Sequence, residues 1–302
     1  MDTELLRAFL AVTASESFSL AAERLHLTQP AISKRIALLE TRLGVRLFDR
    51  IGRRVSLTET GRQLLPRAQR IVREIEDTER AIRDLSGSVS GPLSLATSHH
   101  VGLHRLPPVL RSFVRRFPQV RLAIEFMDSE KAYGTVAQGE HELAVITLAP
   151  AGASSRLESR LIWADPLSVM VAHDHPLATK RRASIAELAG YPAVLPGTGT
   201  WTGQILQELF IANGIRLEAS MSTNYLETLR MLATIGLGWT VLPESMCTDE
   251  LVPIELPGTR LQRQLGYVVH REHTLSSAAR AMIELLLCEA TAGSAGSSAQ
   301  SG

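Results

Sequence analysis

A short polar segment, Thr28-Gln-Pro-Ala-Ile-Ser-Lys-Arg35, carries side chains whose types and spacing suit the recognition of DNA. Glutamine offers a hydrogen-bond donor and an acceptor, serine offers either, and lysine brings a positive charge for guanine or phosphate. Proline adds an apolar surface that can contact a thymine methyl group. We therefore predict that four residues read base edges: Gln29, Pro30, Ser33 and Lys34.

The same segment has the spacing of a helix with one buried face. Ile32, Ile36 and Leu39 fall at i, i+4 and i+7, so they predict a buried stripe that turns the base-reading residues outward. Thr28 is a suitable N-cap for this helix. A preceding helix from a cap at Ser19 to about residue 26 completes a helix-turn-helix. The alternative is an ordinary solvated helix face.

A basic stretch follows the second helix. Residues 43–57 alternate in polarity and turn at Ile51-Gly52, which predicts a short β-hairpin, or wing. Between His26 and Leu57, seven Lys and Arg stand against two acidic residues, a local charge of +5 in a chain whose total is +1. Such an excess beside a helix-turn-helix is typical of phosphate binding. We expect phosphate contacts from five residues: Thr28, Arg35, Arg50, Arg53 and Arg54.

Residues 59–86 predict a long amphipathic helix. Its apolar and small residues alternate spacings of four and three from Leu64 to Leu85, as in a heptad seam, and Pro66 should kink or loosen one turn. The stripe can pack on the chain's own domains or on the same helix of a second chain. We favour the second, because helix-turn-helix proteins read two half-sites as symmetric dimers. The Gly- and Ser-rich residues 87–91 predict a hinge.

Together these motifs resemble the LysR-type transcriptional regulators. The resemblance is carried by Phe18–Leu25, Thr28–Ile36, Leu38–Glu40, Leu43–Arg50 and Leu57–Gly61, and more weakly by Arg105–Leu110 and Gly236–Pro243. It implies an α+β multidomain chain with a winged helix-turn-helix at residues 1–58, a dimerising linker helix at 59–86 and an effector-binding domain at 92–290. That domain is expected to be an α/β fold similar to type 2 periplasmic binding proteins, with two subdomains around a cleft.

The resemblance also implies partners. These are double-stranded promoter or operator DNA, a small-molecule effector, and other copies of the chain, first as a dimer through the linker helix and then as a tetramer. RNA polymerase is a further candidate partner. The chain departs from the family at Glu142, where Asp commonly precedes the third strand of the effector domain.

Residues 92–290 alternate predicted strands and helices, which indicates a largely parallel sheet. We place subdomain I at 92–164 and 266–290, subdomain II at 165–265, and a disordered Ala-, Gly- and Ser-rich tail at 291–302. Ligands of open α/β sheets bind beyond the carboxyl ends of the strands. On that rule we predict effector contacts from eight residues: Thr97, Ser98, His99, His100, Ser129, Thr147, Thr198 and Thr200.

Free N–H groups at the helix N-termini after these strands favour a carboxylate or another oxyanion as effector. The resemblance points to Ser98 and Ser129 in particular. Each hydroxyl has an alternative role, because Ser and Thr are also ordinary helix caps.

Several kinds of site are not expected. His100 and His104 share a helix face, but no Cys or clustered carboxylate completes a metal site, so we expect no metal. Cys247 and Cys288 are the only cysteines and lack basic neighbours or a CxxC motif, which fits a reducing compartment. No signal peptide or long apolar run is present, so we expect a cytoplasmic protein without membrane contact.

Two rival functions stay open on the residues alone. An architectural DNA-binding protein without an effector would share the N-terminal motifs but have a filled, apolar cleft. An enzyme with an appended DNA-binding module would need a catalytic motif, and none of the common serine-hydrolase, phosphate-loop or zinc patterns occurs. We therefore expect no catalytic residues and no cofactor.

Overall fold

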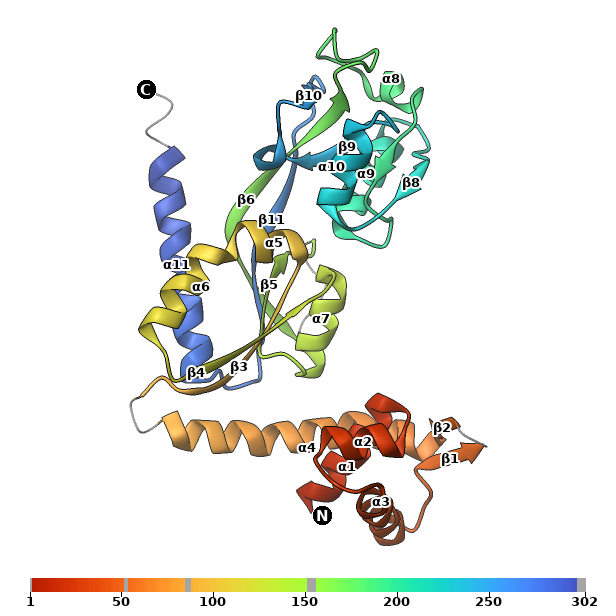
Figure 1. Ribbon diagram of the computed structural model, residues 1–302, viewed down its shortest axis with the longest axis vertical. Coiled ribbons are helices and arrows are strands. Elements are labelled where there is room, and N and C mark those ends of the chain that lie inside the picture. Colours follow the sequence, from red (N-terminus) through yellow and green to blue (C-terminus); the bar gives the residue numbers. More distant parts are fainter. Residues whose placement is uncertain (1, 52–53, 85–87, 151–155, 298–302) are drawn as a thin grey trace. The chain divides into compact units, whose positions relative to one another are not determined.

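The computed structural model describes residues 2–51, 54–84, 88–150 and 156–297. The chain divides into two compact units, residues 1–87 and 88–302 (Figure 1). The N-terminal unit consists of helices, a β-hairpin and a long final helix. Its elements are α1 (Thr3–Ser15), α2 (Phe18–Arg24), α3 (Gln29–Leu43), β1 (Phe48–Ile51), β2 (Arg54–Leu57) and α4 (Glu59–Asp84).

Local capping sets where the helices of the helix-turn-helix begin. Thr28 caps α3 as predicted, because its hydroxyl oxygen accepts a hydrogen bond from the N–H of Ala31 at 3.4 Å. The predicted cap of α2 is wrong: Ser17, not Ser19, occupies that position. The helix already begins at Phe18, whose side chain is buried in the core of the unit, so the cap must precede it.

The predicted stripe of α3 forms the centre of the unit's core. Ile32, Ile36 and Leu39 are fully buried and pack with side chains of α1 and α2. Burying an aliphatic side chain contributes about 1.5–3 kcal/mol, so these three residues determine which face of α3 points outward. The predicted wing is present as the antiparallel pair β1–β2. Phe48, at its start, places its ring 5.4 Å from that of Phe9 and attaches the hairpin to the helices.

The long helix α4 is shared between two environments. It continues through Pro66 without interruption. Ala68 and Val72 are buried in the core of the N-terminal unit, whereas Ile82, near the other end, is 65% exposed. The first part of the predicted stripe therefore packs on the chain's own helices, and the later part leaves Ile82 open to solvent.

The C-terminal unit is an α/β domain. Its strands are β3 (Gly91–Thr97), β4 (Val120–Phe126), β5 (Leu143–Thr147), β6 (Leu157–Ala172), β7 (Val194–Leu195), β8 (Met221–Ser222), β9 (Thr240–Pro243), β10 (Leu251–Ile254) and β11 (Leu261–His270). Its helices are α5 (His99–His104), α6 (Leu106–Arg116), α7 (Ser129–Gln138), α8 (Ile185–Ala189), α9 (Trp201–Ala212), α10 (Leu226–Thr234), the 3-10 turn η1 (Glu244–Met246) and α11 (Ser277–Ser297).

The main sheet is mixed rather than largely parallel as expected. Its order is β10-β6-β11-β5-β3-β4, with β9 also pairing with β6. The strands β4, β3 and β5 are parallel, but β11 is antiparallel to both β5 and β6. The reason is that β6 and β11 carry the chain out to a second group of elements and back again.

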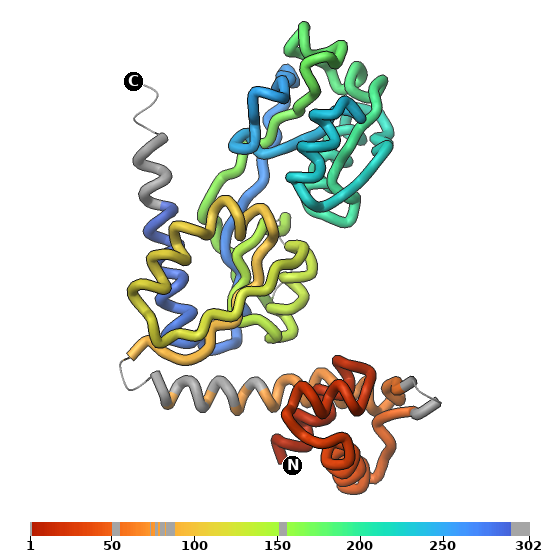
Figure 2. The backbone as a smooth tube through the Cα atoms, in the orientation of Figure 1, coloured from red at the N-terminus to blue at the C-terminus, as the bar shows by residue number. Residues whose placement is uncertain are grey.

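These two long strands define two subdomains within the C-terminal unit. In Figure 2, β6 and β11 run side by side from one group of elements to the other. One group packs its helices α5, α6, α7 and α11 on the parallel strands, and the other contains α8, α9 and α10. The register pairs Arg263 with Asp165 where the strands leave subdomain I.

The C-terminal helix is longer than the sequence indicated. We expected the domain to end at residue 290 and a disordered tail to follow, but α11 continues to Ser297. Residues 290–297 contain three alanines, which favour a helix, and two glycines, which do not, so their composition alone does not explain the difference. Residues 298–302 of the predicted tail lie outside the described residues. Among the helices that the structure describes, none has the length and apolar character needed to cross a membrane.

Candidate functional site

The outward face of α3 presents the predicted base-reading side chains. Gln29, Pro30 and Lys34 are exposed, and Ser33 is half-buried beside them. Gln29 Nε2 donates a hydrogen bond to Ser33 Oγ at 3.0 Å, one helical turn further along. The four side chains are therefore accessible near the N-terminus of a helix whose opposite face is fixed in the core.

The predicted phosphate contacts are described only in part. Thr28 is exposed at the start of α3, where its hydroxyl caps the helix. Arg35 is 29% exposed, and its guanidinium pairs with the Glu4 carboxylate at 2.9 Å. Arg53 and the side chains of Arg50 and Arg54 lie outside the described residues.

Glu40, to which sequence reasoning gave no structural role, attaches the wing to α3. Glu40 Oε1 accepts hydrogen bonds from the backbone N–H groups of Leu47, at 2.7 Å, and Phe48, at 3.4 Å. At the other end of the hairpin, the Thr58 hydroxyl donates to the carbonyl oxygen of Arg46 at 2.8 Å. These bonds fix the position of the hairpin relative to the recognition helix.

The C-terminal unit contains a pocket at the carboxyl ends of its parallel strands. The pocket holds about 500 Å³ of empty space, part of which is open to solvent. It is lined by Ser98, His99, His100, Asp128, Ser129, Glu130, Thr147, Pro196, Thr200, Thr202, Asn224, Leu226 and Arg263.

The strand order explains why these residues meet. The carboxyl ends of β5, β3 and β4 lie next to one another, and the chain turns there into α5 after β3 and into α7 after β4. The long strand β11 lies beside β5 and supplies Arg263. Subdomain II contributes the loop before α9 and the N-terminal end of α10. The pocket therefore lies between the subdomains.

Six of the eight predicted effector residues line this pocket. They are Ser98, His99, His100, Ser129, Thr147 and Thr200. Thr97 does not, because its side chain is fully buried and its hydroxyl donates to the carbonyl oxygen of Val145 at 2.7 Å. Thr198 is exposed in the loop before α9 and is also outside the lining.

The hydroxyl groups that line the pocket differ in their local roles. Thr200 caps α9 and accepts from the N–H of Gly203 at 3.0 Å, and Ser129 Oγ accepts from the N–H of Thr147 at 3.2 Å. Ser98 occupies the N-cap position of α5, yet its side chain makes no capping hydrogen bond. The Thr200 hydroxyl is thus engaged by its own helix and the Ser129 hydroxyl by strand β5, whereas Ser98 makes no capping bond.

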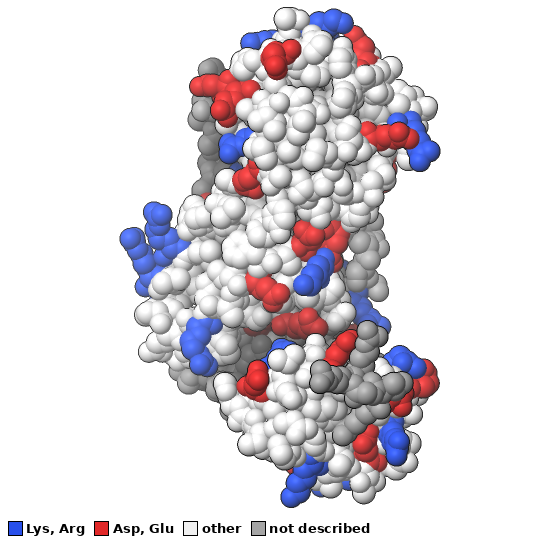
Figure 3. Space-filling view, turned by 45° about the vertical axis from the view of Figure 1, so that its right-hand side comes forward, with Lys and Arg blue, Asp and Glu red and all other residues white. Residues whose placement is uncertain are grey.

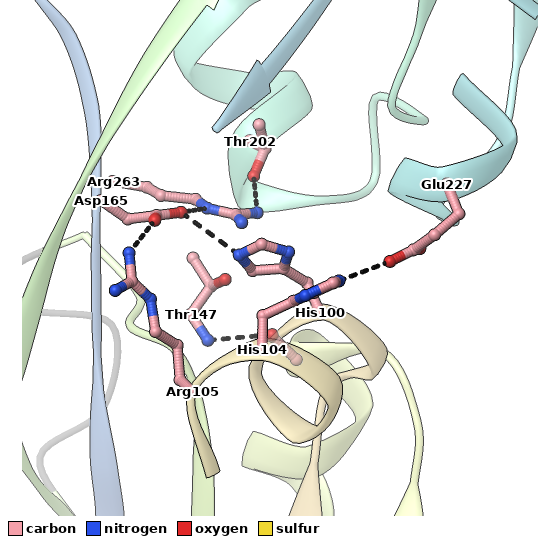
Figure 4. A network of polar contacts seen from close by, with 9 residues as sticks. His100, His104, Arg105, Thr147, Asp165, Thr202, Glu227 and Arg263 are labelled. Carbon is pink, nitrogen blue, oxygen red and sulfur yellow. Dashed lines mark hydrogen bonds and ion pairs between the residues drawn. The ribbon is translucent and has the colours of Figure 1, made fainter. Parts of the chain in front are cut away.

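A buried ion cluster lies at the inner side of the pocket and reaches its lining through Arg263 and His100 (Figure 4). Asp165 is 1% exposed and accepts from Arg263 Nε at 2.7 Å and from Arg105 Nη2 at 2.9 Å. Arg263 Nη1 also donates to the Thr202 hydroxyl at 3.4 Å. The imidazole of His100 lies 3.8 Å from the same carboxylate.

Sequence reasoning missed this cluster. Asp165 stands among apolar residues of β6, and a charge inside a buried strand is a recognisable signal, because such charges must be paired. Arg263 gives a weaker signal, because the exposed Gln262 and Gln264 flank it in β11. The partner is set by the antiparallel register of β6 and β11, which joins residues 98 positions apart. Arg105 reaches the same carboxylate from the junction of α5 and α6.

His100 is held neutral by its surroundings. Burial lowers the pKa of its imidazole to about 4, because the charged form loses its hydration, and the positive charge of Arg263 acts in the same direction. Asp165 opposes the shift but does not reverse it. Neither ring nitrogen has a hydrogen-bond partner among the described residues, and Nε2 lies on the side of Asp165, so the pocket is lined here by an uncharged imidazole.

Three polar contacts join the subdomains around the pocket. Glu130 Oε1 accepts from the N–H of Trp201 at 2.7 Å, and Asp128 Oδ2 accepts from Asn224 Nδ2 at 2.9 Å. A third contact of 2.9 Å lies between the His104 imidazole and the Glu227 carboxylate. A ligand that changes these contacts would change how the two subdomains are held.

On the face drawn in Figure 3, acidic and basic side chains of the described residues are interspersed over the surface. Within the part of the chain that the structure describes, no three His, Cys, Asp or Glu side chains gather in a way that would hold a metal ion.

Comparison with known proteins gives two sequence-family matches. Residues 3–62 match "Bacterial regulatory helix-turn-helix protein, lysR family", and residues 86–291 match "LysR substrate binding domain". Together they span both units of the chain.

Individual relatives agree with these matches. The chain is 68% identical over 108 residues, 36% of its length and 75% of the relative's, to an uncharacterized HTH-type transcriptional regulator in the ibpB-leuC intergenic region of Azotobacter vinelandii. It is 30% identical over 290 residues to the RuBisCO operon transcriptional regulator of Allochromatium vinosum, covering 94% of this chain and 95% of that one. The full-length structure of CbnR complexed with its target DNA has a TM-score of 0.64 and 22% identity, covering 96% of this chain and 100% of that one.

Proposed function

This chain belongs to the LysR family of bacterial transcriptional regulators, and we propose that a small anionic effector bound in its pocket modulates the binding of the chain to promoter DNA. Family membership makes the chain a DNA-binding transcription regulator with an effector-binding domain, and not an enzyme. The nature of the effector and the way it acts are the new elements of the proposal.

The main evidence for an anionic effector is the incomplete hydrogen bonding of the buried Arg263 guanidinium. Its side chain is 6% exposed, Nε pairs with Asp165 and Nη1 contacts Thr202, but Nη2 has no hydrogen-bond partner among the described residues. Leaving a buried donor unsatisfied costs about 1–3 kcal/mol, and more when the donor is charged. A carboxylate or phosphate oxygen in the pocket would satisfy this N–H and gain a charge-assisted bond.

The other lining groups support the same chemistry. Ser98 offers a hydroxyl that does not cap its own helix, and His100 offers two ring nitrogens without hydrogen bonds to described residues. In the inner cluster two guanidinium groups, of Arg105 and Arg263, face the single carboxylate of Asp165. The cluster therefore carries a net positive charge, of which Arg263 is the member that lines the pocket, while His100 stays neutral.

In DNA binding, one set of residues would read bases and another would contact phosphates. Gln29, Pro30, Ser33 and Lys34 read base edges from the outward face of α3. Thr28, Arg35 and the wing arginines 50, 53 and 54 contact phosphates, so binding should weaken steeply with added salt.

We also propose that the chain acts as a homo-oligomer. The exposed Ile82 near the end of α4 is the kind of apolar position that a second copy of the helix would cover, giving a dimer. Pairing of dimers would give a tetramer. Contact with RNA polymerase would then couple the bound oligomer to transcription.

The experiment measures thermal unfolding of the full-length chain by tryptophan fluorescence with a panel of small carboxylates and phosphates. Trp163, Trp201 and Trp239 are the only tryptophans and all lie in the C-terminal unit, so the signal reports on that unit. An effector at 100 times its Kd should stabilise the unit by about 3 kcal/mol. If no anion shifts the midpoint, the anionic effector is wrong and an architectural role is favoured.

Ser98→Val tests the site itself. This variant should lose the response to the effector while its DNA binding without effector stays as in the wild type. Thr198→Val is the matched control, because Thr198 is exposed and outside the pocket lining, and it should respond normally. An unaltered response in Ser98→Val would remove Ser98 from the site.

A further inference from the structure

The pocket has an acidic rim, formed by Asp128 and Glu130, and a ligand with only negative charge gives these carboxylates no partner. Asp128 and Glu130 line the pocket together with Arg263, so two carboxylates face the same space as one guanidinium. A purely anionic ligand would be attracted by the inner wall and repelled by the rim. The charges that line the pocket are therefore separated, positive inside and negative outside.

The order of the strands places the positive and negative side chains of the pocket at different positions along the edge of the sheet. Arg263 lies on β11, and Asp128 follows β4, with β5 and β3 between those strands. Neighbouring strands are about 4.8 Å apart, so the two groups enter the pocket from different ends of the sheet edge. Long side chains bring the opposite charges closer together than the strands themselves. Glu130 accepts from the N–H of Trp201, and Arg263 donates to the hydroxyl of the next residue, Thr202, so both side chains reach the start of α9.

The rim carboxylates retain capacity for a ligand. Asp128 occupies the N-cap position of α7, where Asp commonly caps, but its side chain makes no capping bond and instead accepts from Asn224 through Oδ2. Glu130 accepts from Trp201 through Oε1. An ionised carboxylate has about four lone-pair sites on its two oxygens, so one such bond leaves each group able to accept from a cation.

We infer that the effector is a zwitterion of the amino-acid type, whose carboxylate meets Arg263 and Ser98 and whose ammonium group lies at Asp128 and Glu130. This inference rests on the proposed anionic effector and adds a required positive charge. Arg263 supplies the independent indication that a ligand binds here, since it is 94% buried and its Nη2 lacks a partner among the described residues. A compact molecule with opposite charges a few bonds apart would satisfy both walls.

The test compares three sets of probes on the full-length chain: the standard L-amino acids, the corresponding carboxylic acids without the α-amino group, and the corresponding amines without the carboxylate. Binding is followed by tryptophan fluorescence, because the backbone of Trp201 contacts Glu130. At least one amino acid should bind tenfold or more tightly than both of its truncated analogues. If the carboxylic acids bind as well as the amino acids, the zwitterion is wrong while the anionic effector stands. If no probe of any set binds, the zwitterion and the anionic site are both overturned.

Two charge-removing variants test the assignment of the ammonium group. Asp128→Asn and Glu130→Gln should each weaken amino-acid binding tenfold or more and leave binding of the carboxylic acids unchanged or tighter. Glu158→Gln, which removes an exposed acidic charge from β6, should change neither. Equal weakening of both probe classes, or no weakening in either rim variant, would overturn the inference. Circular dichroism confirms that each variant is folded.

Discussion

Replacing His100 with glutamine should remove much of the acid sensitivity of the C-terminal unit. In the folded chain burial lowers the pKa of the His100 imidazole to about 4, whereas the unfolded chain has a value near 6.5. Between these two values the unfolded state binds a proton that the folded state does not. The stability of the unit should therefore fall as the pH is lowered from 6.5 toward 4.

The size of the effect follows from the shift. One pKa unit corresponds to about 1.4 kcal/mol, so protonation of the unfolded state should cost the wild type about 2–3 kcal/mol between pH 7.5 and pH 4.5. The variant loses this contribution, because glutamine does not titrate. All other titrating groups are common to both proteins and cancel in the difference between them.

The assay is urea unfolding of both full-length proteins, followed by tryptophan fluorescence at a series of pH values. The free-energy difference between wild type and His100→Gln should change by about 2–3 kcal/mol across the range. His26→Gln, in the N-terminal unit where no tryptophan lies, is the control and should follow the wild type. Parallel curves for wild type and His100→Gln would show that the His100 imidazole is not kept neutral by burial in the folded chain.

Three further substitutions test other parts of the account. Lys34→Ala should weaken operator binding by about 1–3 kcal/mol more than non-specific binding, as titrations with both DNAs would show; an equal loss would make Lys34 a phosphate contact. Gly61→Ala should destabilise the N-terminal unit by about 1–3 kcal/mol in far-ultraviolet circular dichroism, because a Cβ there collides with the carbonyl oxygen of Leu47, and a neutral result would contradict that packing. Asp165→Asn should destabilise the C-terminal unit by about 3 kcal/mol or more, because Arg263 then loses its buried counter-charge, and a loss below about 1 kcal/mol in urea unfolding would count against the ion cluster.

Much of the N-terminal unit could be predicted because its determinants are local. The stripe of Ile32, Ile36 and Leu39 lies within one helix, and the cap at Thr28 precedes it directly. The cap of α2 was misplaced because Ser17 and Ser19 are equally good caps by type. Burial of Phe18 in the core, a tertiary effect, decided between them.

The residues that line the pocket could be predicted only where their place at the end of a strand brings them there. Ser98 and Ser129 follow parallel strands and reach the pocket by the carboxyl-edge rule. Thr97, one residue earlier, is still the last residue of β3, and its hydroxyl donates to the carbonyl oxygen of Val145 on the neighbouring strand instead. Asp165 and Arg263 meet through strand register over 98 positions, which no local pattern encodes.

Effector-controlled DNA binding is tested most directly by footprinting of the DNA upstream of the neighbouring gene with the full-length chain, with and without the amino-acid panel. We expect a protected site that needs more protein in Lys34→Ala, weakens steeply with salt and changes its extent or affinity when the effector binds. Failure to protect any promoter fragment even at low ionic strength would contradict the DNA-binding face. A footprint that no ligand alters would contradict the role of the pocket.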